Sequence, residues 1–423
     1  MPLISSNESG IDSGSEWLGN VPFSWSMVLL SQVVSQVKNK NSDLSEKNLL
    51  SLSCGKIKRK PIDTTEGLLP ASFDGYNIIE ANDIVLRLTD LQNDHSSLRV
   101  GISTEKGIIT SAYITMRPKN SKTAKFLYYL LHTFDVRKGF YGMGSGVRQG
   151  LNYGEVKRLK IPFPAEDEQV AIANFLDNEI MRVDSIISEA KASIEEYKCW
   201  KASIIYEAVT KGLAPCVGMK DSGVEWIGKI PSNWTTKSIK YVMQESKERT
   251  ATGTEEMLSV TQKYGIIKSS DATISNPSTS TEDWRIVHIG DIVFNKYKAH
   301  SGVFFVSPLE GIVTFNYCVY RCFPDNCAKY FEYQFKTPRC IGEFITHMKG
   351  VGDSISPLYT TELYKIKVIV PPIEEQLRIV EYLNIQCSKI DAIISEKESL
   401  VADLESYKKS LIFEVVTGKR RVV

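Results

Sequence analysis

The stretch DSGVEWIGKIPSNW at residues 221–234 repeats, nearly residue for residue, the stretch DSGSEWLGNVPFSW at residues 12–25. Eight of the fourteen residues are identical, and the shared tryptophans and proline lie 209 positions apart. A match that keeps two tryptophans at fixed spacing indicates an internal duplication, which must be settled before any fold is inferred.

The repeat continues in the same order through each half of the chain. Asp83 of NDIVLRL matches Asp291 of GDIVFNK, and both copies close on a proline-containing stretch that leads into an acidic segment. The sequence therefore predicts a tandem duplication of about 208 residues. Further matched stretches are GIITSAYITMR (107–117) with GIVTFNYCVYR (311–321), AKFLYYL (124–130) with AKYFEYQ (328–334), and KIPFPAEDEQVAIANFLD (160–177) with KVIVPPIEEQLRIVEYLN (367–384).

Each copy changes character near Pro164 or Pro371. Before these prolines, alternating β-branched and aromatic runs broken by Gly, Asp and Asn predict strands with short helices between them. After them, no Gly or Pro occurs in 165–211 or 373–417, which predicts one long helix per copy. We expect an α/β (α+β) fold with two recognition domains in tandem, separated by two long helices. The predicted boundaries are 1–165 and 213–370 for the domains, and 166–212 and 371–423 for the helices.

The apolar residues of both long segments recur every three or four positions, which is typical of a coiled-coil seam. Helices of this length reach about 65–70 Å, so they extend beyond a small domain and favour pairing with each other over packing on their own domains. Because a folded domain intervenes, an antiparallel coiled coil is the simplest arrangement. The expected seam comprises Val183, Ile186, Ile187, Ala190, Ile194, Tyr197, Trp200, Ile204 and Ala208, facing Ile390, Ile393, Ile394, Leu400, Val401, Leu404, Tyr407, Leu411 and Val415.

Composition and charge indicate a soluble protein with anionic partners. The chain is 42% hydrophobic and 24% charged, with no basic-then-apolar start and no apolar run of membrane length, so we expect a cytoplasmic location and no membrane contact. Residues 1–165 carry a net +5 and residues 213–370 a net +2, whereas 166–212 carry −5 and 371–423 carry −1. No two of the eight cysteines have the spacing of a zinc knuckle, so no metal site is expected.

Motifs for catalysis are missing from the sequence. It has no phosphate loop, no H-E-x-x-H and no G-x-S-x-G. FYGMGSG (140–146) fits the F-x-G-x-G pattern of a methyl-donor loop, but the Asn/Asp-Pro-Pro-Tyr/Phe tetrad that accompanies such a loop is absent, and the second copy has HMKGVGDS instead. We interpret it as a flexible loop and expect neither catalytic residues nor a cofactor.

Polar, basic and aromatic residues gather in predicted loops, and these loops differ most between the otherwise similar copies. Lys and Arg suit phosphates, whereas Gln, Asn, His and Ser can bond base edges. Two similar frames with different loops are typical of a reader of a two-part DNA site. The candidate contacts are Lys56, Lys58, Arg59, Lys60, Arg87, Gln92, Asn93, His95, Arg99, Arg148 and Gln149 in the first copy, and Gln262, Lys263, Tyr264, Lys296, Tyr297, Lys298, His300 and Ser354 in the second.

Over its whole length the chain resembles the DNA specificity subunits of type I restriction–modification systems. The resemblance rests on the E-W-[IL]-G-x-[IV]-P-x-x-W opening of each half, the [GN]-D-I-V run, the proline and E-Q entry to each helix, and the helix ends EAVTKG (207–212) and EVVTGK (414–419).

This resemblance implies a subunit without catalysis of its own. It would read a split duplex DNA target with one domain per half, and it would dock two methylation subunits and restriction subunits. Two other interpretations stay open: a stand-alone methyltransferase that uses the glycine loop, and a duplicated scaffold or ligand-binding protein without a DNA role.

Overall fold

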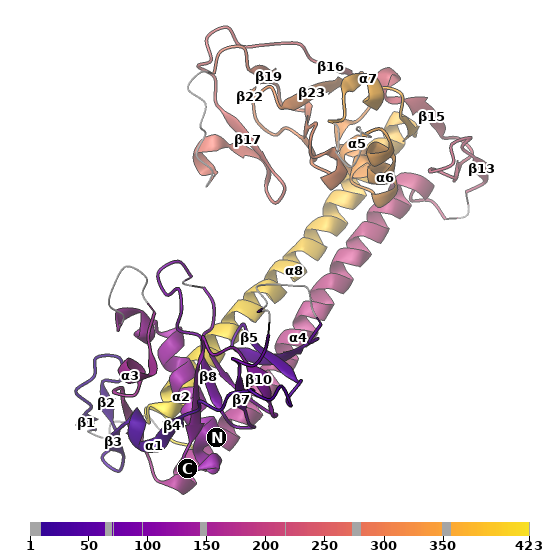
Figure 1. The fold of residues 1–423 in the computed structure, drawn as a ribbon. Coiled ribbons are helices and arrows are strands. Elements are labelled where there is room, and N and C mark those ends of the chain that lie inside the picture. The colour runs from indigo at the N-terminus through magenta and orange to yellow at the C-terminus, as the bar shows by residue number, and fades with distance from the viewer. Residues whose placement is uncertain are drawn as a thin grey trace. The chain divides into compact units, whose positions relative to one another are not determined.

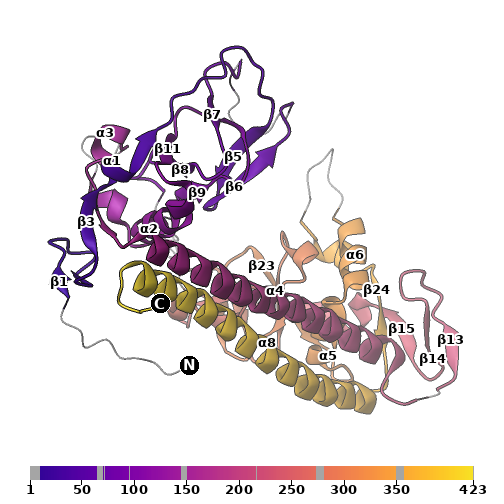
Figure 2. The same ribbon diagram turned by 90° about the horizontal axis from the view of Figure 1, so that it is seen from below.

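The computed structural model describes residues 10–63, 70, 72–94, 96–143, 150–215, 217–272, 281–348 and 357–422. The chain divides into two compact units: unit 1 is Met1–Lys191 with Ser399–Val423, and unit 2 is Ala192–Glu398. Figure 1 shows the ribbon coloured along the chain, and Figure 2 shows it turned by 90°. The boundary falls inside both long helices, so each unit contains a head, meaning its residues outside those helices, and one part of each helix.

An antiparallel four-stranded sheet forms the centre of the unit 1 head, in the order β4-β11-β8-β9. Its strand β8 is the apolar run IVL and is fully buried. Helix α2 (Ala124–Val136) packs against β9 and buries Phe126, Leu130 and Leu131, which recur at helical spacing. The strands are β4 (Val34–Gln36), β8 (Ile84–Leu86), β9 (Val100–Ile102) and β11 (Ile114–Pro118).

A second sheet of the unit 1 head has the order β6-β5-β10-β7. Gly107 opens β10 because a Cβ there would lie 2.5 Å from the carbonyl oxygen of Asn48. The strands are β5 (Leu49–Ser53), β6 (Lys56–Lys60), β7 (Asn77–Ile79) and β10 (Gly107–Ile109). The remaining elements are the pairs β1 (Ile11–Asp12) with β2 (Asn20–Val21) and β3 (Ser26–Leu29) with β12 (Lys160–Phe163), the helices α1 (Leu30–Val33) and α3 (Tyr153–Val156), and the 3-10 turns η1 (Ser121–Thr123) and η2 (Gly139–Gly142).

The head of unit 2 repeats this plan. Its central sheet has the order β16-β23-β20-β21, and Gly311 again meets a backbone carbonyl, that of Glu256. The tandem repeat predicted from the sequence is therefore confirmed. The strands are β13 (Met219–Asp221), β14 (Lys229–Pro231), β15 (Thr235–Ser238), β16 (Met243–Glu245), β17 (Leu258–Thr261), β18 (Gly265–Lys268), β19 (Arg285–Val287), β20 (Ile292–Asn295), β21 (Phe304–Val306), β22 (Gly311–Val313), β23 (Tyr317–Cys322) and β24 (Lys367–Val370).

Short helices complete the unit 2 head. Helix α5 occupies the place that α2 holds in unit 1, and it contacts β21. These helices are α5 (Ala328–Phe335), α6 (Pro338–Thr346) and α7 (Thr360–Leu363), with 3-10 turns η3 (Ile239–Tyr241), η4 (Ser269–Asp271) and η5 (Ala299–Ser301).

The long helices α4 (Glu166–Lys211) and α8 (Ile373–Val416) pair antiparallel within unit 1. Lys408 Nζ donates to Asp184 Oδ1 at 2.6 Å, and Lys191 Nζ donates to Glu405 Oε1 at 3.1 Å. The residue number rises along α4 as it falls along α8, which fixes the direction. An apolar cluster lies between these ion pairs and comprises Val183, Ile187, Ala190, Val401 and Leu404.

The same direction holds within unit 2. Lys201 Nζ donates to Asp391 at 2.6 Å, and Lys397 Nζ lies 5.9 Å from the ring centroid of Tyr197. The predicted antiparallel pairing is therefore confirmed in each unit.

Four residues of the expected seam are instead exposed: Ile186, Trp200, Leu400 and Tyr407 have exposed fractions of 46%, 52%, 45% and 43%. The seam between two helices is a narrow stripe, and one residue step turns an α-helix by about 100°. Ile186 and Leu400 each precede a buried seam residue by one position, so that rotation takes them out of the interface. The prediction was wrong for these four positions.

The duplicated tryptophans hold the start of each long helix. In unit 1, Trp25 Nε1 donates to Glu168 Oε1 at 2.9 Å, and in unit 2, Trp234 Nε1 donates to Glu375 Oε2 at 2.8 Å. A carboxylate in the first turn also suits the positive end of the helix dipole. The opening motif of each copy is thus a structural joint between head and helix.

The glutamine of each helix entry closes the same joint from inside. Gln169 Nε2 donates to the carbonyl of Pro164, and Gln376 Nε2 donates to that of Pro371, both at 2.8 Å. Both glutamines are fully buried, so these hydrogen bonds satisfy polar groups that water does not reach.

A glycine with positive φ follows each long helix and lies against an opening motif. Gly212 has φ +78°, and a Cβ there would lie 3.1 Å from Trp234. Gly418 has φ +73°, and a Cβ there would lie 2.4 Å from Pro22 and 3.3 Å from Trp25. The end of α4 therefore packs on the unit 2 motif, and the end of α8 packs on the unit 1 motif.

Candidate nucleic-acid interface

An ion pair between a buried aspartate and a partly exposed arginine fixes the central sheet of each head in the same way. In unit 1, Arg117 donates through Nε and Nη2 to the two carboxylate oxygens of Asp83, both at 2.7 Å. In unit 2, Arg321 makes the same bidentate contact with Asp291, at 2.9 and 3.1 Å. The hydrogen bonds to these carboxylates raise the pKa of both guanidinium groups. Each head therefore has the same frame beneath its loops, meaning a central sheet fixed by an Asp–Arg ion pair.

The hairpin β5–β6 of unit 1 carries a row of lysines. Lys56, Lys58 and Lys60 alternate along β6, so their side chains emerge from the same face of the strand, and all three are exposed. None of them has an ion pair in the described part of the chain. The row offers three free positive charges at the spacing of alternate strand residues, which suits the phosphates of a nucleic-acid backbone.

Arg59 lies on the opposite face of β6, where Glu105 engages it. Its Nε donates to both carboxylate oxygens of Glu105 at 2.8 Å. The hydrogen bond from Arg59 lowers the pKa of the Glu105 carboxyl, and that carboxylate raises the pKa of Arg59. Of the four basic residues predicted on this strand, Arg59 is therefore the one whose charge is already balanced within the head.

The hairpin β17–β18 holds the corresponding place in unit 2, but its polar residues lie on the turn. Gln262, Lys263 and Tyr264 are all exposed, Tyr264 at 66%, and Lys263 Nζ lies 5.0 Å from the tyrosine ring centroid. Thr261 Oγ1 donates to the Gly265 carbonyl at 3.1 Å and accepts from Tyr264 N at 3.0 Å, so it shapes the turn. An exposed cation beside an aromatic ring can contact both phosphate and base.

Arg99 was predicted to contact DNA, but the structure places it fully inside the unit 1 head. Its exposed fraction is 0%, and its guanidinium donates to the backbone carbonyls of Arg87, Thr89, Asp90 and Asp94. The buried guanidinium of Arg99 donates its hydrogen bonds to these carbonyls and cannot reach a nucleic acid, so we remove Arg99 from the contact set. Its chemistry instead fixes the loop between β8 and β9.

That loop carries four other predicted contacts, of which the structure describes Arg87, Gln92 and Asn93. Gln92 and Asn93 are exposed, and Asn93 Nδ2 donates to Asp90 Oδ1 at 2.7 Å. Arg87 is half-buried at the start of the loop, where its backbone N donates to the Arg99 carbonyl at 2.9 Å. The amides of Gln92 and Asn93 are therefore the groups that this loop offers at the surface.

The loop after β20 is the counterpart in unit 2. Tyr297 is 49% exposed, Lys298 is exposed, and Lys296 is half-buried with its Nζ 5.4 Å from the Tyr297 ring centroid. His300 is half-buried in η5, and its Nδ1 has no hydrogen-bond partner in the described part of the chain. Unit 2 thus brings two lysine–tyrosine pairs to its surface.

Both copies of the repeat match the same protein-family model. The model of the type I restriction modification DNA specificity domain matches the chain twice, over residues 36–196 and 231–400. The chain belongs to this DNA specificity family. The family resemblance inferred from the sequence is confirmed, and so is the DNA specificity role.

Two specificity subunits from one organism are similar to this chain, one over nearly its whole length and one over about half of it. The putative type I restriction enzyme MjaX specificity subunit of Methanocaldococcus jannaschii is 24% identical over 433 residues, 96% of each chain. The type I restriction enzyme MjaVIII specificity subunit of the same organism is 24% identical over 228 residues, 53% of this chain and 50% of that one.

Solved structures share the fold. The HsdS subunit from Thermoanaerobacter tengcongensis matches 94% of this chain and 98% of its own, with 14% identity and a TM-score of 0.51. A chain described under "Structural basis underlying complex assembly and conformational transition of the type I R-M system" has the same identity and coverage, with a TM-score of 0.67.

The glycine loop does not have the setting of a methyl-donor site in this specificity subunit. Its described part, η2, follows helix α2 through Lys138, whereas a methyl-donor loop should follow a strand. Residues 144–149 of the loop lie outside the described residues, together with the predicted contacts Arg148 and Gln149. His95 and Ser354 lie outside them as well.

The described residues offer neither a metal-binding cluster nor a membrane-spanning helix. They contain no group of three or more His, Cys, Asp or Glu side chains placed to hold a metal ion. No helix among them is both long and apolar enough to cross a bilayer.

Proposed function

We propose that the chain reads a split duplex target, with residues 1–165 reading one half and residues 213–370 reading the other. The observation that carries this proposal is the pair of hairpins. The same ion-paired frame presents a lysine row in unit 1 and a Gln-Lys-Tyr turn in unit 2. Two equal frames with different exposed chemistry suit two different DNA half-sites.

Each group in the contact set has a distinct task. Lys56, Lys58 and Lys60 hold phosphates, while the amides of Gln92 and Asn93 can bond base edges in the major groove. In unit 2, the residues with these tasks are Gln262, Lys263, Tyr264, Lys296, Tyr297, Lys298 and His300. Arg87, His95, Arg148, Gln149 and Ser354 stay in the set without an assigned task, whereas Arg59, whose charge Glu105 already balances, only adjoins the lysine row.

The chain acts in this scheme without catalysis and works in the cytoplasm, where it docks two methylation subunits and restriction subunits. Support for two docking places comes from Trp200 and Tyr407, exposed aromatic residues at equivalent positions of α4 and α8. Exposed aromatic residues are typical anchors of protein interfaces. Replacing both by Ser should abolish co-purification of the methylation subunits. Replacing exposed Lys389 by Ser should leave co-purification unchanged.

An exchange of one domain tests the two-part reading. A hybrid chain that carries residues 1–165 from a relative is expressed with the methylation subunits, and methylated genomic sites are then sequenced. We expect one half of the motif to change while the other half is retained. A hybrid in which both halves change together would show that the domains do not read independently.

A further inference from the structure

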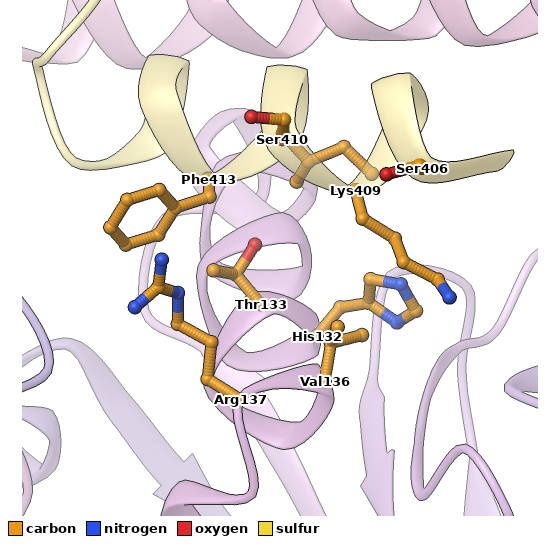
Figure 3. A pocket seen from close by; sticks show the side chains of 9 residues that line it. His132, Thr133, Val136, Arg137, Ser406, Lys409, Ser410 and Phe413 are labelled. Atoms are coloured by element: carbon orange, nitrogen blue, oxygen red, sulfur yellow. The ribbon is translucent and has the colours of Figure 1, made fainter. Parts of the chain in front are cut away.

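A pocket of about 220 Å³ lies between the end of α2 and the C-terminal part of α8 in unit 1 (Figure 3). Its lining combines apolar Val136, Ile412 and Phe413 with six basic or polar residues. Arg137 and Lys409 bring positive charge, and an imidazole and three hydroxyl groups complete its polar lining. No Asp or Glu is among the described residues that line it. These polar lining residues are His132, Thr133, Arg137, Ser406, Lys409 and Ser410.

No ion pair balances the positive charge of this pocket in the part of unit 1 that the structure describes. Neither Arg137 nor Lys409 forms an ion pair in the described part of the chain, whereas neighbouring Lys408 is paired with Asp184 at 2.6 Å. The Arg137 guanidinium carbon lies 3.6 Å from the ring centroid of Phe413, and Lys419 Nζ lies 4.6 Å from the same centroid. Burial, and then the charge of Arg137, lower the pKa of Lys419.

Unit 2 neutralises the corresponding place with its own carboxylate. In the matched stretches AKFLYYLLHT and AKYFEYQFKT, Lys336 stands where His132 does, and Glu332 stands where Tyr128 does. Lys336 Nζ donates to Glu332 Oε1 at 2.7 Å, and Glu332 is buried. Unit 1 has a histidine and a tyrosine at these two positions, so it lacks this internal ion pair.

His132 adds an unused polar atom to the pocket wall. Its Nδ1 is buried and has no hydrogen-bond partner in the described part of the chain. Burial, with a smaller contribution from the charge of Lys408, lowers the pKa of His132 to about 4, so the ring is neutral at pH 7. Figure 3 shows His132 on α2 and Arg137 directly after it, opposite Lys409 and Phe413 on α8.

Two residues close to Arg137 in the sequence contact the loop that Arg99 fixes. Asp135, two residues before Arg137, accepts from the backbone N of Arg99 at 2.6 Å. Tyr141, four residues after Arg137, donates to the Asp94 carbonyl at 3.0 Å. The stretch of chain that carries Arg137 is thus tied to the loop of Gln92 and Asn93 through these two residues.

We propose that this pocket binds one phosphate group of the DNA backbone, beside the half-site that the unit 1 head reads. The proposal rests on the proposed function. The fork of Arg137 suits two phosphate oxygens, Lys409 adds a second charge, and the hydroxyl groups of Thr133 and Ser406 can donate to the same anion. Arg137 and Lys409 are both exposed, so a phosphate still joined to a polymer can reach them.

The salt dependence of binding tests the pocket directly. Arg137→Gln with Lys409→Gln is compared with the wild type on a duplex that carries the target mapped from methylated genomic sites. Loss of one phosphate contact should reduce the slope of log K against log salt by about 0.9. The matched control is Arg378→Gln with Lys389→Gln, two exposed cations on the unit 2 part of α8, which should keep the wild-type slope.

The outcomes separate this proposal from the proposed function. A wild type that binds no duplex contradicts the proposed function, whereas wild-type binding with an unchanged slope in the pocket variant overturns the pocket alone. The His132 NMR signal gives a second measurement on the unaltered chain. Its pKa should rise when the duplex is added, because a nearby phosphate favours the imidazolium. A rise with inorganic phosphate or with the methylation subunits, but not with the duplex, would overturn the proposal.

Discussion

The hairpins β5–β6 and β17–β18 occupy the same place in their heads but carry different chemistry. In unit 1 the returning strand is KIKRK, with three free lysines on one face. In unit 2 it is GIIK, with Ile266 buried and Lys268 paired with Glu256 at 3.1 Å, and the polar residues have moved to the turn. The residues that differ between the two hairpins lie outside the ion-paired frame of each head.

The positions that stay the same have internal partners. Asp83 with Arg117 and Asp291 with Arg321 repeat the same bidentate geometry, because a buried carboxylate without its partner is costly. The exposed face of a hairpin bears no such cost. Duplication followed by divergence can therefore change the exposed residues of the hairpin while the fold of the head stays the same.

The largest expected effect comes from breaking the frame in one unit. Arg117→Met leaves the Asp83 carboxylate buried and unpaired, which should destabilise unit 1 by about 3 kcal/mol, near the low end for a broken buried pair because Arg117 is 48% exposed. Hydrogen exchange of β8 and β11 should accelerate while β20 and β23 keep their protection. Arg321→Met should reverse this pattern, and equal loss in both units from either variant would contradict the shared-frame comparison.

A second difference between units is the pH dependence of stability. The folded pKa of His132 is lowered to about 4 from 6.5, so between these values the unfolded chain binds more protons. Unit 1 should therefore lose about 2–3 kcal/mol as pH falls from 6.5 to 4. In unit 2 the matched residue is Lys336, which contributes no imidazole titration. Urea unfolding in phosphate-free buffer measures the loss, and His132→Gln should remove it.

The lysine row should account for much of the salt dependence of DNA binding. Replacing Lys56, Lys58 and Lys60 by Gln removes three phosphate contacts, so the slope of log K against log salt should fall by about 2.7. Arg59→Gln is the control on the same strand, and it should change the slope little because Glu105 already balances that charge. Comparable slopes for the two variants would mean that the exposed face of β6 does not meet DNA.

The smallest effect is expected at the unit 2 turn. Lys263→Gln should reduce the same slope by about 0.9, one phosphate contact. Lys268→Gln, whose charge is paired with Glu256 at 3.1 Å, provides the matched control. If Lys268→Gln has the larger effect, the strand rather than the turn is the contacting surface in unit 2.

Local sequence signals predicted the frame well. The Pro-containing entries predicted where the long helices begin, and Gly212 and Gly418 predicted where they end. Glycine readily adopts the positive φ that ends a helix, and both glycines have it here. The duplicated tryptophans indicated an internal duplication, and in the structure the second tryptophan of each motif makes the same hydrogen bond to a glutamate.

The site was less predictable because its partners are distant in sequence. Arg99 reads like any loop arginine until its carbonyl acceptors are seen, and Arg59 meets Glu105 from 46 positions away. The pocket joins Arg137 to Phe413, residues that no spacing rule connects. The coiled-coil seam was predicted too wide, because in the sequence the exposed apolar residues next to the helix interface cannot be told from those within it.

The two units also differ in how the chain is shared between them. Unit 2 is one continuous stretch, whereas unit 1 joins Met1–Lys191 to Ser399–Val423. Leu411 and Val415 of α8 belong to the same apolar core as Phe126 and Leu176. Since synthesis proceeds from the N-terminus, the head made first can complete its core only after residues 399–416 have left the ribosome. Until then part of its apolar core stays unpacked. The unit whose synthesis begins first is therefore the one that completes its folding last.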